Sequence, residues 1–111
     1  MDASNYKILD VSRGLTYSYY FAAAQPSKPT ILFIHGFPST SWDWHKQVEH
    51  FEALGYGIVV PDTLGYGGTS KPTDPELYRS SLVTKDLLEI LDKEGLHSVI
   101  VIGHDWCVSM L

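Results

Sequence analysis

The fold is decided by residues 98–111, which read SVIVIGHDWCVSML. An apolar run ends at Ile102 and is followed by a small-x-acid-x-small pattern centred on Asp105. Small residues on both sides allow a sharp bend between a strand and a helix, because bulky side chains there would collide with the adjacent backbone. A carboxylate presented on such a bend is a nucleophile that forms a covalent ester. The stretch therefore predicts a nucleophile elbow with Asp105 as the nucleophile.

The rest of the chain alternates between strand and helix patterns. Side chains alternate from Leu15 to Phe21, which predicts a strand with one buried face. Residues 7–11 are a candidate partner strand, joined to it through a turn at Arg13-Gly14. Continuous apolar runs predict three more strands, each covered on both faces of the sheet. These runs are residues 30–34, 58–60 and 98–102.

Two helices are predicted between the apolar strands. One runs from Ser41 to Leu54 and the other from Ser81 to Glu94, each stopped by a glycine. A short extra helical turn is expected at Asp74-Pro75-Glu76. The sequence therefore predicts an α/β fold with a mostly parallel sheet and an N-terminal antiparallel hairpin. The apolar stripes of the helices are Trp44, Val48, Phe51 and Leu54 in the first, and Val83, Leu87, Ile90 and Leu91 in the second.

Composition excludes several classes of function. The 111 residues are 44% hydrophobic, enough for the core of one domain. Thirteen acidic against eight basic residues give a formal charge of −5, which does not suit binding to nucleic acid or to an anionic membrane. One cysteine argues against an intrachain disulfide and a cysteine-built metal site. No apolar run approaches the ~20 residues of a membrane span, so we expect a cytoplasmic protein.

Two loops follow earlier strands at positions that suit the same chemistry. His35-Gly36-Phe37-Pro38 directly follows strand 30–34. We expect the backbone N–H of Phe37 to join that of Trp106 in an oxyanion hole. Residues 62–70 (DTLGYGGTS) follow the next strand, with glycines that permit positive φ in a tight loop.

Together these motifs resemble the α/β-hydrolase superfamily and, within it, the epoxide hydrolases. The resemblance implies that Asp105 attacks an epoxide carbon, while Phe37 and Trp106 supply backbone donors. It also implies a small apolar epoxide as substrate, no metal or organic cofactor, and a cis bond before Pro38. Cys107 departs from the family, which usually has glycine there. The residues that carry the resemblance are His35, Gly36, Phe37, Pro38, Trp44, Gln47, the loop 62–70, Gly103, His104, Asp105 and Trp106.

The catalytic set is incomplete within these residues. In this fold the acid and the histidine follow the nucleophile in chain order, and only six residues follow Asp105. We interpret residues 1–111 as the N-terminal portion of a catalytic domain, comprising its first five strands and two helices and ending just after the elbow. We expect this portion to be inactive alone and its chemistry to stop at the ester. None of the histidines is expected to replace the missing base; they are His35, His45, His50, His97 and His104.

Two alternatives stay open. A haloalkane or haloacid dehalogenase shares the aspartate elbow, and Trp106 beside the nucleophile suits halide binding. Phe37 argues against it, because those enzymes tend to carry an amide side chain at that place. The other alternative is a non-catalytic interaction module, since one side of strand 98–102 would be unpaired and open to a second polypeptide. The same edge predicts self-association and marginal stability of the chain alone.

Overall fold

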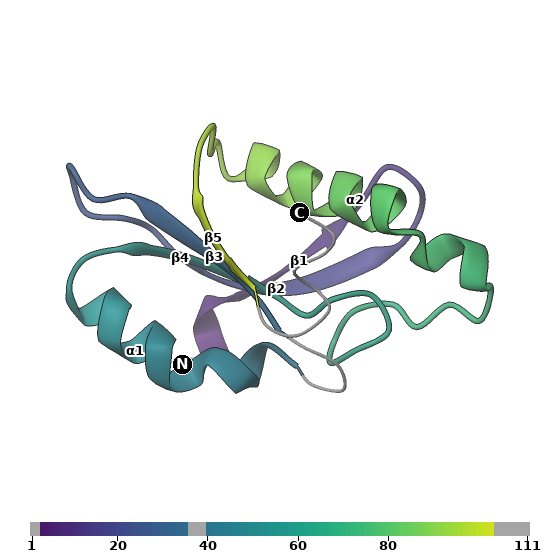
Figure 1. Cartoon of the computed structure of the whole chain (residues 1–111), viewed down its shortest axis with the longest axis horizontal. Coiled ribbons are helices and arrows are strands. Elements are labelled where there is room, and N and C mark those ends of the chain that lie inside the picture. Colours follow the sequence, from purple (N-terminus) through teal and green to yellow (C-terminus); the bar gives the residue numbers. More distant parts are fainter. Residues whose placement is uncertain (1–2, 36–39, 104–111) are drawn as a thin grey trace.

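The computed structural model describes residues 3–35 and 40–103, which form a five-stranded sheet with one helix on each face (Figure 1). The strand order across the sheet is β1-β2-β4-β3-β5. This arrangement confirms the predicted α/β class. The strands are β1 (Tyr6–Asp10), β2 (Thr16–Ala22), β3 (Thr30–Ile34), β4 (Gly57–Pro61) and β5 (Ile100–Gly103). The helices are α1 (His45–Ala53) and α2 (Ser80–Lys93), with short 3-10 turns η1 (Ala3–Asn5), η2 (Ser41–Trp44) and η3 (Pro75–Tyr78).

The sheet has an antiparallel part and a parallel part. β1 and β2 form the predicted hairpin, closed by a turn in which Gly14 has a φ of 86°. β2 pairs antiparallel with β4, and β4 pairs parallel with β3. β5 pairs parallel with the other side of β3, with Ile31 opposite Ile100 and Ile34 opposite Gly103. The carboxyl ends of β4, β3 and β5 therefore share one edge of the sheet.

The helices cover opposite faces, and each closes its own apolar cluster. α1 contributes Val48 to the cluster that contains Phe33, whereas α2 covers Leu32 and Ile34 on the other face. Successive side chains of a strand point to opposite faces, so β3 contributes to both clusters and all its residues are buried. The predicted apolar run 30–34 is thus a central strand between two layers of helix.

Both helices begin close to their predicted starts. The first predicted helix opens with the turn η2, where the Thr40 hydroxyl accepts a hydrogen bond from the Trp42 N–H at 3.3 Å. The expected extra turn before α2 is η3, whose Asp74 carboxylate accepts from the Glu76 N–H at 3.0 Å. Side chains that cap the first N–H groups stabilise helix starts in this way. Among the helices of the described ranges, none is long and apolar enough to cross a membrane.

Three expectations about burial are wrong. β2 is buried on both faces, because Tyr20 packs on the α1 side while its neighbours pack under α2. Leu54 is 50% exposed because α1 ends one residue before it. β5 is covered only in part: Ile100 is 47% and Val101 40% exposed, whereas Ile102 packs half-buried against the cluster on the α1 side. Among the described residues β5 is the last strand on its side of the sheet, whereas α2 bonds to side chains of β1 and β2 at the other side, which leaves this part of β5 less covered.

Candidate active site

The carboxyl edge of the parallel strands brings together the segments that carry the sequence motifs. His35 directly follows β3, and Asp62 directly follows β4. The pairing of Ile34 with Gly103 places the ends of β3 and β5 side by side. In open α/β sheets, ligands bind beyond the carboxyl ends of the strands. The candidate active site therefore lies at this edge of the sheet.

His35 is fully buried and serves as a hydrogen-bond acceptor. Its Nε2 accepts the backbone N–H of Thr63 at 2.9 Å and lies 3.1 Å from the Thr63 hydroxyl. The ring meets the ring of Tyr66 edge-on, with centroids 5.6 Å apart. A backbone N–H only donates, so the Nε2 lone pair is engaged and the imidazole is neutral with its proton on Nδ1. The arrangement ties the end of β3 to the loop after β4.

The Asp62 carboxylate organises the loop 62–70. It is 5% exposed, and its two oxygens accept the backbone N–H of Ser41 at 2.7 Å and of Gly68 at 3.1 Å. Gly67 has a φ of 55°, and a Cβ atom there would lie 2.4 Å from this carboxylate. Two features thus favour glycine at position 67: the positive φ, and the Asp62 carboxylate, which would collide with any side chain there. The predicted tight loop is folded around one buried acid.

The same network reaches two other elements. The Ser41 hydroxyl and the Tyr6 hydroxyl share a hydrogen bond of 2.7 Å, which joins the start of η2 to β1. The Thr69 hydroxyl donates to the Asp62 carbonyl at 2.6 Å and accepts the Ser18 N–H at 3.0 Å. Sequence reasoning missed the role of Asp62. The available signal was an acid directly after a buried strand, with glycines three, five and six positions later.

The described residues include only part of the predicted site. His35 lies at the end of β3, as described above, and Gly103 is the half-buried last residue of β5. The predicted nucleophile and the predicted oxyanion donors lie outside the described ranges, so their roles remain predictions. The predicted site residues that the structure does not describe are Gly36, Phe37, Pro38, His104, Asp105 and Trp106.

The other described histidines lie away from this edge. His97 is exposed and precedes β5, at the opposite end of that strand. His45 stacks on the Trp42 ring at 4.3 Å, and His50 is exposed on α1. Within residues 3–35 and 40–103, no group of three or more His, Cys, Asp or Glu side chains is placed to hold a metal ion.

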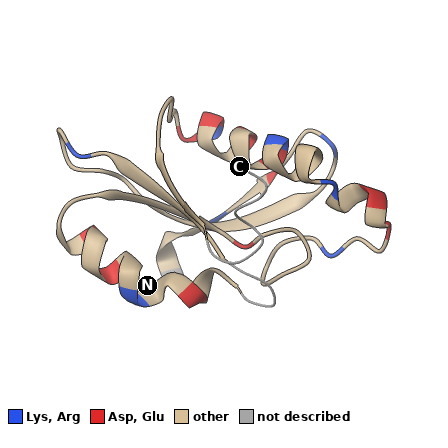
Figure 2. Ribbon diagram, in the orientation of Figure 1, with Lys and Arg blue, Asp and Glu red and all other residues tan. Residues whose placement is uncertain are grey.

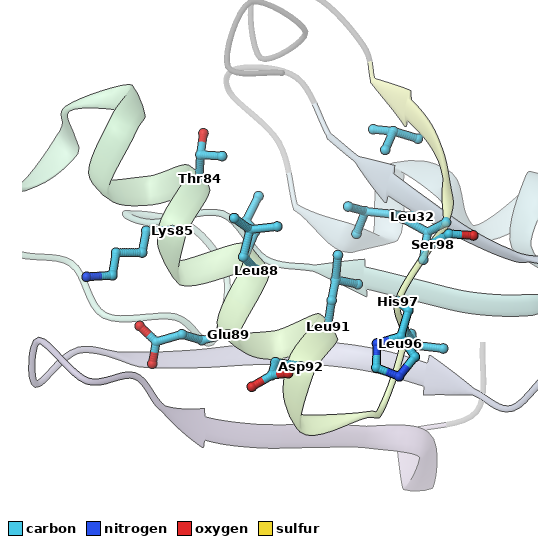
Figure 3. A pocket seen from close by; sticks show the side chains of 13 residues that line it. Leu32, Thr84, Lys85, Leu88, Glu89, Leu91, Asp92, Leu96, His97 and Ser98 are labelled. Atoms are coloured by element: carbon cyan, nitrogen blue, oxygen red, sulfur yellow. The ribbon is translucent and has the colours of Figure 1, made fainter.

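A cavity formed by described residues also lies away from the carboxyl edge. It has a volume of about 580 Å³ and opens between α2 and β5 (Figure 3). His97, Ser98 and Val99 line it, so it extends toward the amino end of β5. It is therefore distinct from the candidate site.

Comparison with known proteins identifies the fold family. The family model of the alpha/beta hydrolase fold matches residues 29–106. The chain belongs to the α/β-hydrolase family. An epoxide hydrolase of Caballeronia sordidicola is 42% identical to this α/β-hydrolase over 82 residues, which make up 74% of this chain and 25% of that protein. Epoxide hydrolase A of Mycobacterium tuberculosis is 37% identical over 84 residues, 76% of this chain and 26% of its own.

Solved structures agree with the sequence relatives. Epoxide hydrolase A from Mycobacterium thermoresistibile superposes with a TM-score of 0.83 at 30% identity, over 95% of this α/β-hydrolase chain and 32% of that one. The chain spans about a quarter of the length of the curated relatives it matches. The matched range 29–106 contains the loops after β3 and β4 and the motif that follows β5.

Proposed function

We propose that this chain carries the nucleophile and the oxyanion-binding segments of an epoxide hydrolase, with Asp105 as the nucleophile. The observation that carries the proposal is the pairing of Ile34 with Gly103. Because β3 and β5 are parallel neighbours, the segments that follow them start side by side at the carboxyl edge. Phe37 is three residues beyond Ile34, and Asp105 is two residues beyond Gly103. Relatives named as epoxide hydrolases support the choice of substrate class.

The proposed reaction begins with attack of an Asp105 carboxylate oxygen on an epoxide carbon. The carbon–oxygen bond of the ring breaks, the ring oxygen takes its electron pair, and water protonates the resulting alkoxide. The product is a hydroxyalkyl ester of Asp105. The backbone N–H groups of Phe37 and Trp106 would stabilise the oxyanion that forms when water attacks this ester.

In the 111-residue chain we propose that the ester persists. Hydrolysis requires a base that activates water, and no histidine follows Asp105 in the sequence. His35 is a poor substitute, because its Nε2 already accepts the Thr63 N–H at 2.9 Å. A polypeptide limited to these 111 residues would then perform at most one alkylation per molecule.

The test is incubation of the chain with styrene oxide, followed by intact-mass analysis and peptide mapping. We expect one adduct per chain, with the mass of one epoxide, on the peptide that contains Asp105. Asp105→Asn should abolish it, whereas the exposed control Asp43→Asn should leave it unchanged. Label spread over other residues, or label retained in Asp105→Asn, would contradict the assignment. Continuous formation of diol would contradict the persistence of the ester.

A parallel incubation with a haloalkane separates the dehalogenase alternative. We expect no release of halide above that of Asp105→Asn. Stoichiometric halide release with an alkylated Asp105, and no reaction with styrene oxide, would instead assign the chain to the dehalogenases.

A further inference from the structure

Two described residues flank the segment that carries the proposed oxyanion donor. His35 directly follows β3 and Ser41 opens η2, and residues 36–40 connect them. His35 is fully buried, and Ser41 is 2% exposed. Phe37 follows His35 by two residues. The positions of these two flanks therefore limit where the backbone N–H of Phe37 can be placed.

Both flanks are bonded to the same dipeptide, Asp62-Thr63, which directly follows β4. The Ser41 N–H donates to the Asp62 carboxylate at 2.7 Å. The Thr63 N–H donates to Nε2 of His35 at 2.9 Å, and the Thr63 hydroxyl lies 3.1 Å from the same nitrogen. A short segment whose two ends are held by adjacent residues has fewer conformations available than one with a free end. Asp62 and Thr63 thus restrict this segment from outside it.

The dipeptide is itself held by β2 and by its own loop. The Asp62 N–H donates to the Ser18 carbonyl at 2.9 Å. The Thr69 hydroxyl donates to the Asp62 carbonyl at 2.6 Å and accepts the Ser18 N–H at 3.0 Å. Gly68 supplies a second N–H to the Asp62 carboxylate at 3.1 Å. Residues that orient a functional group do so best when their own positions are held in this way.

The contacts of the Asp62 carboxylate suit an orienting role. Both of its oxygens accept backbone N–H groups, one from η2 and one from the loop 62–70, and the residue is 5% exposed. Its bonding capacity is therefore used to hold two backbone segments. A catalytic acid or base must instead reach a proton of the substrate.

We propose that Asp62 and Thr63 are positioning residues for oxyanion binding, because they hold Ser41 and His35 and thereby the segment that carries Phe37. The inference rests on the proposed function, which gives this segment its role. Residues that act through others in this way set the geometry of the backbone donors without touching the substrate.

The position of the oxyanion donors matters in one half of the proposed chemistry. When Asp105 attacks an epoxide carbon, the negative charge develops on the ring oxygen. When a nucleophile attacks the resulting ester, the charge develops on the carbonyl oxygen, which the oxyanion donors would stabilise. Loss of the positioning contacts should therefore slow cleavage of the ester more than its formation.

Asp86 provides a matched control, because it is also a buried aspartate but lies elsewhere in the fold. Figure 2 marks acidic residues in red on α2 and after β4, in separate parts of the molecule. Asp86 is 1% exposed and accepts hydrogen bonds from Arg13 and Tyr17. Asp86→Ala should therefore destabilise the fold without releasing η2 or the loop 62–70.

The first test measures hydrogen exchange of the Ser41 and Thr63 amides by NMR in the unmodified 111-residue chain. In Asp62→Ala the Ser41 amide loses a charged acceptor, so its exchange should become about tenfold faster or more relative to the amides of α2. Asp86→Ala should not raise this ratio. An unchanged ratio in Asp62→Ala, or an equal rise in Asp86→Ala, would overturn the proposal.

A second pair of variants tests the other flank, and it decides the question if Asp62→Ala does not fold. His35→Leu removes the acceptor of the Thr63 N–H and should speed exchange of this amide about tenfold or more. His35→Gln keeps an acceptor oxygen and should return the exchange to within about threefold of the parent. Equal exchange in His35→Leu and the parent would contradict the role of this bond.

The second test separates the two halves of the chemistry. The chain is labelled with styrene oxide, and the ester is then treated with hydroxylamine, which needs no base from the protein. The hydroxylamine nitrogen attacks the ester carbonyl carbon, and the bond from that carbon to the alkyl oxygen breaks. The diol leaves with the proton that nitrogen gives up, and Asp105 becomes a hydroxamate. Intact mass follows both steps.

We expect the ratio of the cleavage rate to the formation rate to fall about tenfold or more in Asp62→Ala and in His35→Leu. Asp86→Ala and His35→Gln should keep this ratio within about threefold of the parent. An unchanged ratio in Asp62→Ala and His35→Leu, or an equal fall in Asp86→Ala, would refute the positioning role. Absence of any ester in the parent would refute the proposed function instead, and amide exchange would still decide whether the dipeptide holds the two flanks.

Discussion

Among residues 3–35 and 40–103, two carboxylates are buried, Asp86 in α2 and Asp62 after β4, and they are compensated in different ways. Asp86 is 1% exposed and faces a charged partner: the Arg13 guanidinium donates to it through Nη2 at 2.6 Å and through Nε at 2.9 and 3.0 Å. The Tyr17 hydroxyl adds a third donor at 2.7 Å. The hydrogen bonds with Asp86 also raise the pKa of Arg13.

Within the described part of the chain the Asp62 carboxylate bonds to no charged group; the backbone N–H groups of Ser41 and Gly68 compensate it instead. The difference matters because a guanidinium joins distant elements, whereas backbone donors fix the conformation of the loops that supply them. Asp86 holds α2 to the turn between β1 and β2. Asp62 holds together the loops at the carboxyl edge, where we propose that the chemistry takes place.

Removing the charged partner should have the largest effect. Arg13→Met leaves Asp86 buried without its counter-ion, which costs about 3–5 kcal/mol of unfolding free energy. Urea denaturation measures this loss. The double variant Arg13→Met/Asp86→Asn should recover at least half of it, because the uncompensated charge is gone. Arg79→Met is the matched control, since its ion pair with Glu76 is exposed and should contribute nearly nothing. Equal losses in Arg13→Met and Arg79→Met would refute the comparison.

Crowding the backbone-compensated carboxylate should have an intermediate effect. Gly67→Ala places a Cβ atom 2.4 Å from Asp62 at a φ of 55°, and should cost about 2–4 kcal/mol. Gly14→Ala has a similar backbone penalty, with a φ of 86°, but meets nothing within 4 Å and should cost about 1 kcal/mol. Urea denaturation measures the loss of unfolding free energy in each variant. The extra loss in Gly67→Ala is the cost of placing a Cβ atom against the Asp62 carboxylate. No difference would mean that the loop moves away without cost.

The smallest effect concerns the pH dependence of the Asp86 network. Burial, followed by the hydrogen bond with Asp86, raises the pKa of Tyr17 above its ordinary value of 10.0. The folded state then keeps a proton that the unfolded state loses, so stability is intact below pH 10 and falls above it. The slope is about 1.4 kcal/mol per pH unit for each such tyrosine. In Tyr17→Phe the free energy of unfolding should therefore fall less steeply with rising pH, by up to that slope. Denaturation between pH 9 and 11 measures the difference. An unchanged slope would contradict the role of Tyr17.

The elements that sequence predicted best are those with one dominant pattern. The run 30–34 is a fully buried central strand, and Val83, Leu87, Ile90 and Leu91 form the buried stripe of α2 as expected. The spacing of apolar residues predicts this strand and this helix face because each apolar side chain on the pattern can be buried on one side of its element only. The exposure of Ile100 and Val101 was less predictable, since the composition of β5 is that of a strand covered on both faces.

The polar residues at the candidate site were harder to predict. Asp62 accepts hydrogen bonds from residues on either side of it in sequence, 21 positions before and six after, and no local pattern encodes the first of these. Asp86 did leave a signal, because it lies three residues after Val83 and four before Ile90, on the apolar stripe of α2. Its partner Arg13 is 73 residues away, and only the tertiary structure brings the two together.

That separation has a consequence for the synthesis of the chain. Arg13 leaves the ribosome before α2 does, because the acid that neutralises it is translated 73 residues later. At about 5–20 residues per second, the delay is about 4–15 s. During this time Tyr17 and Tyr19 have no helix over them, so this part of the chain exposes apolar surface until α2 emerges.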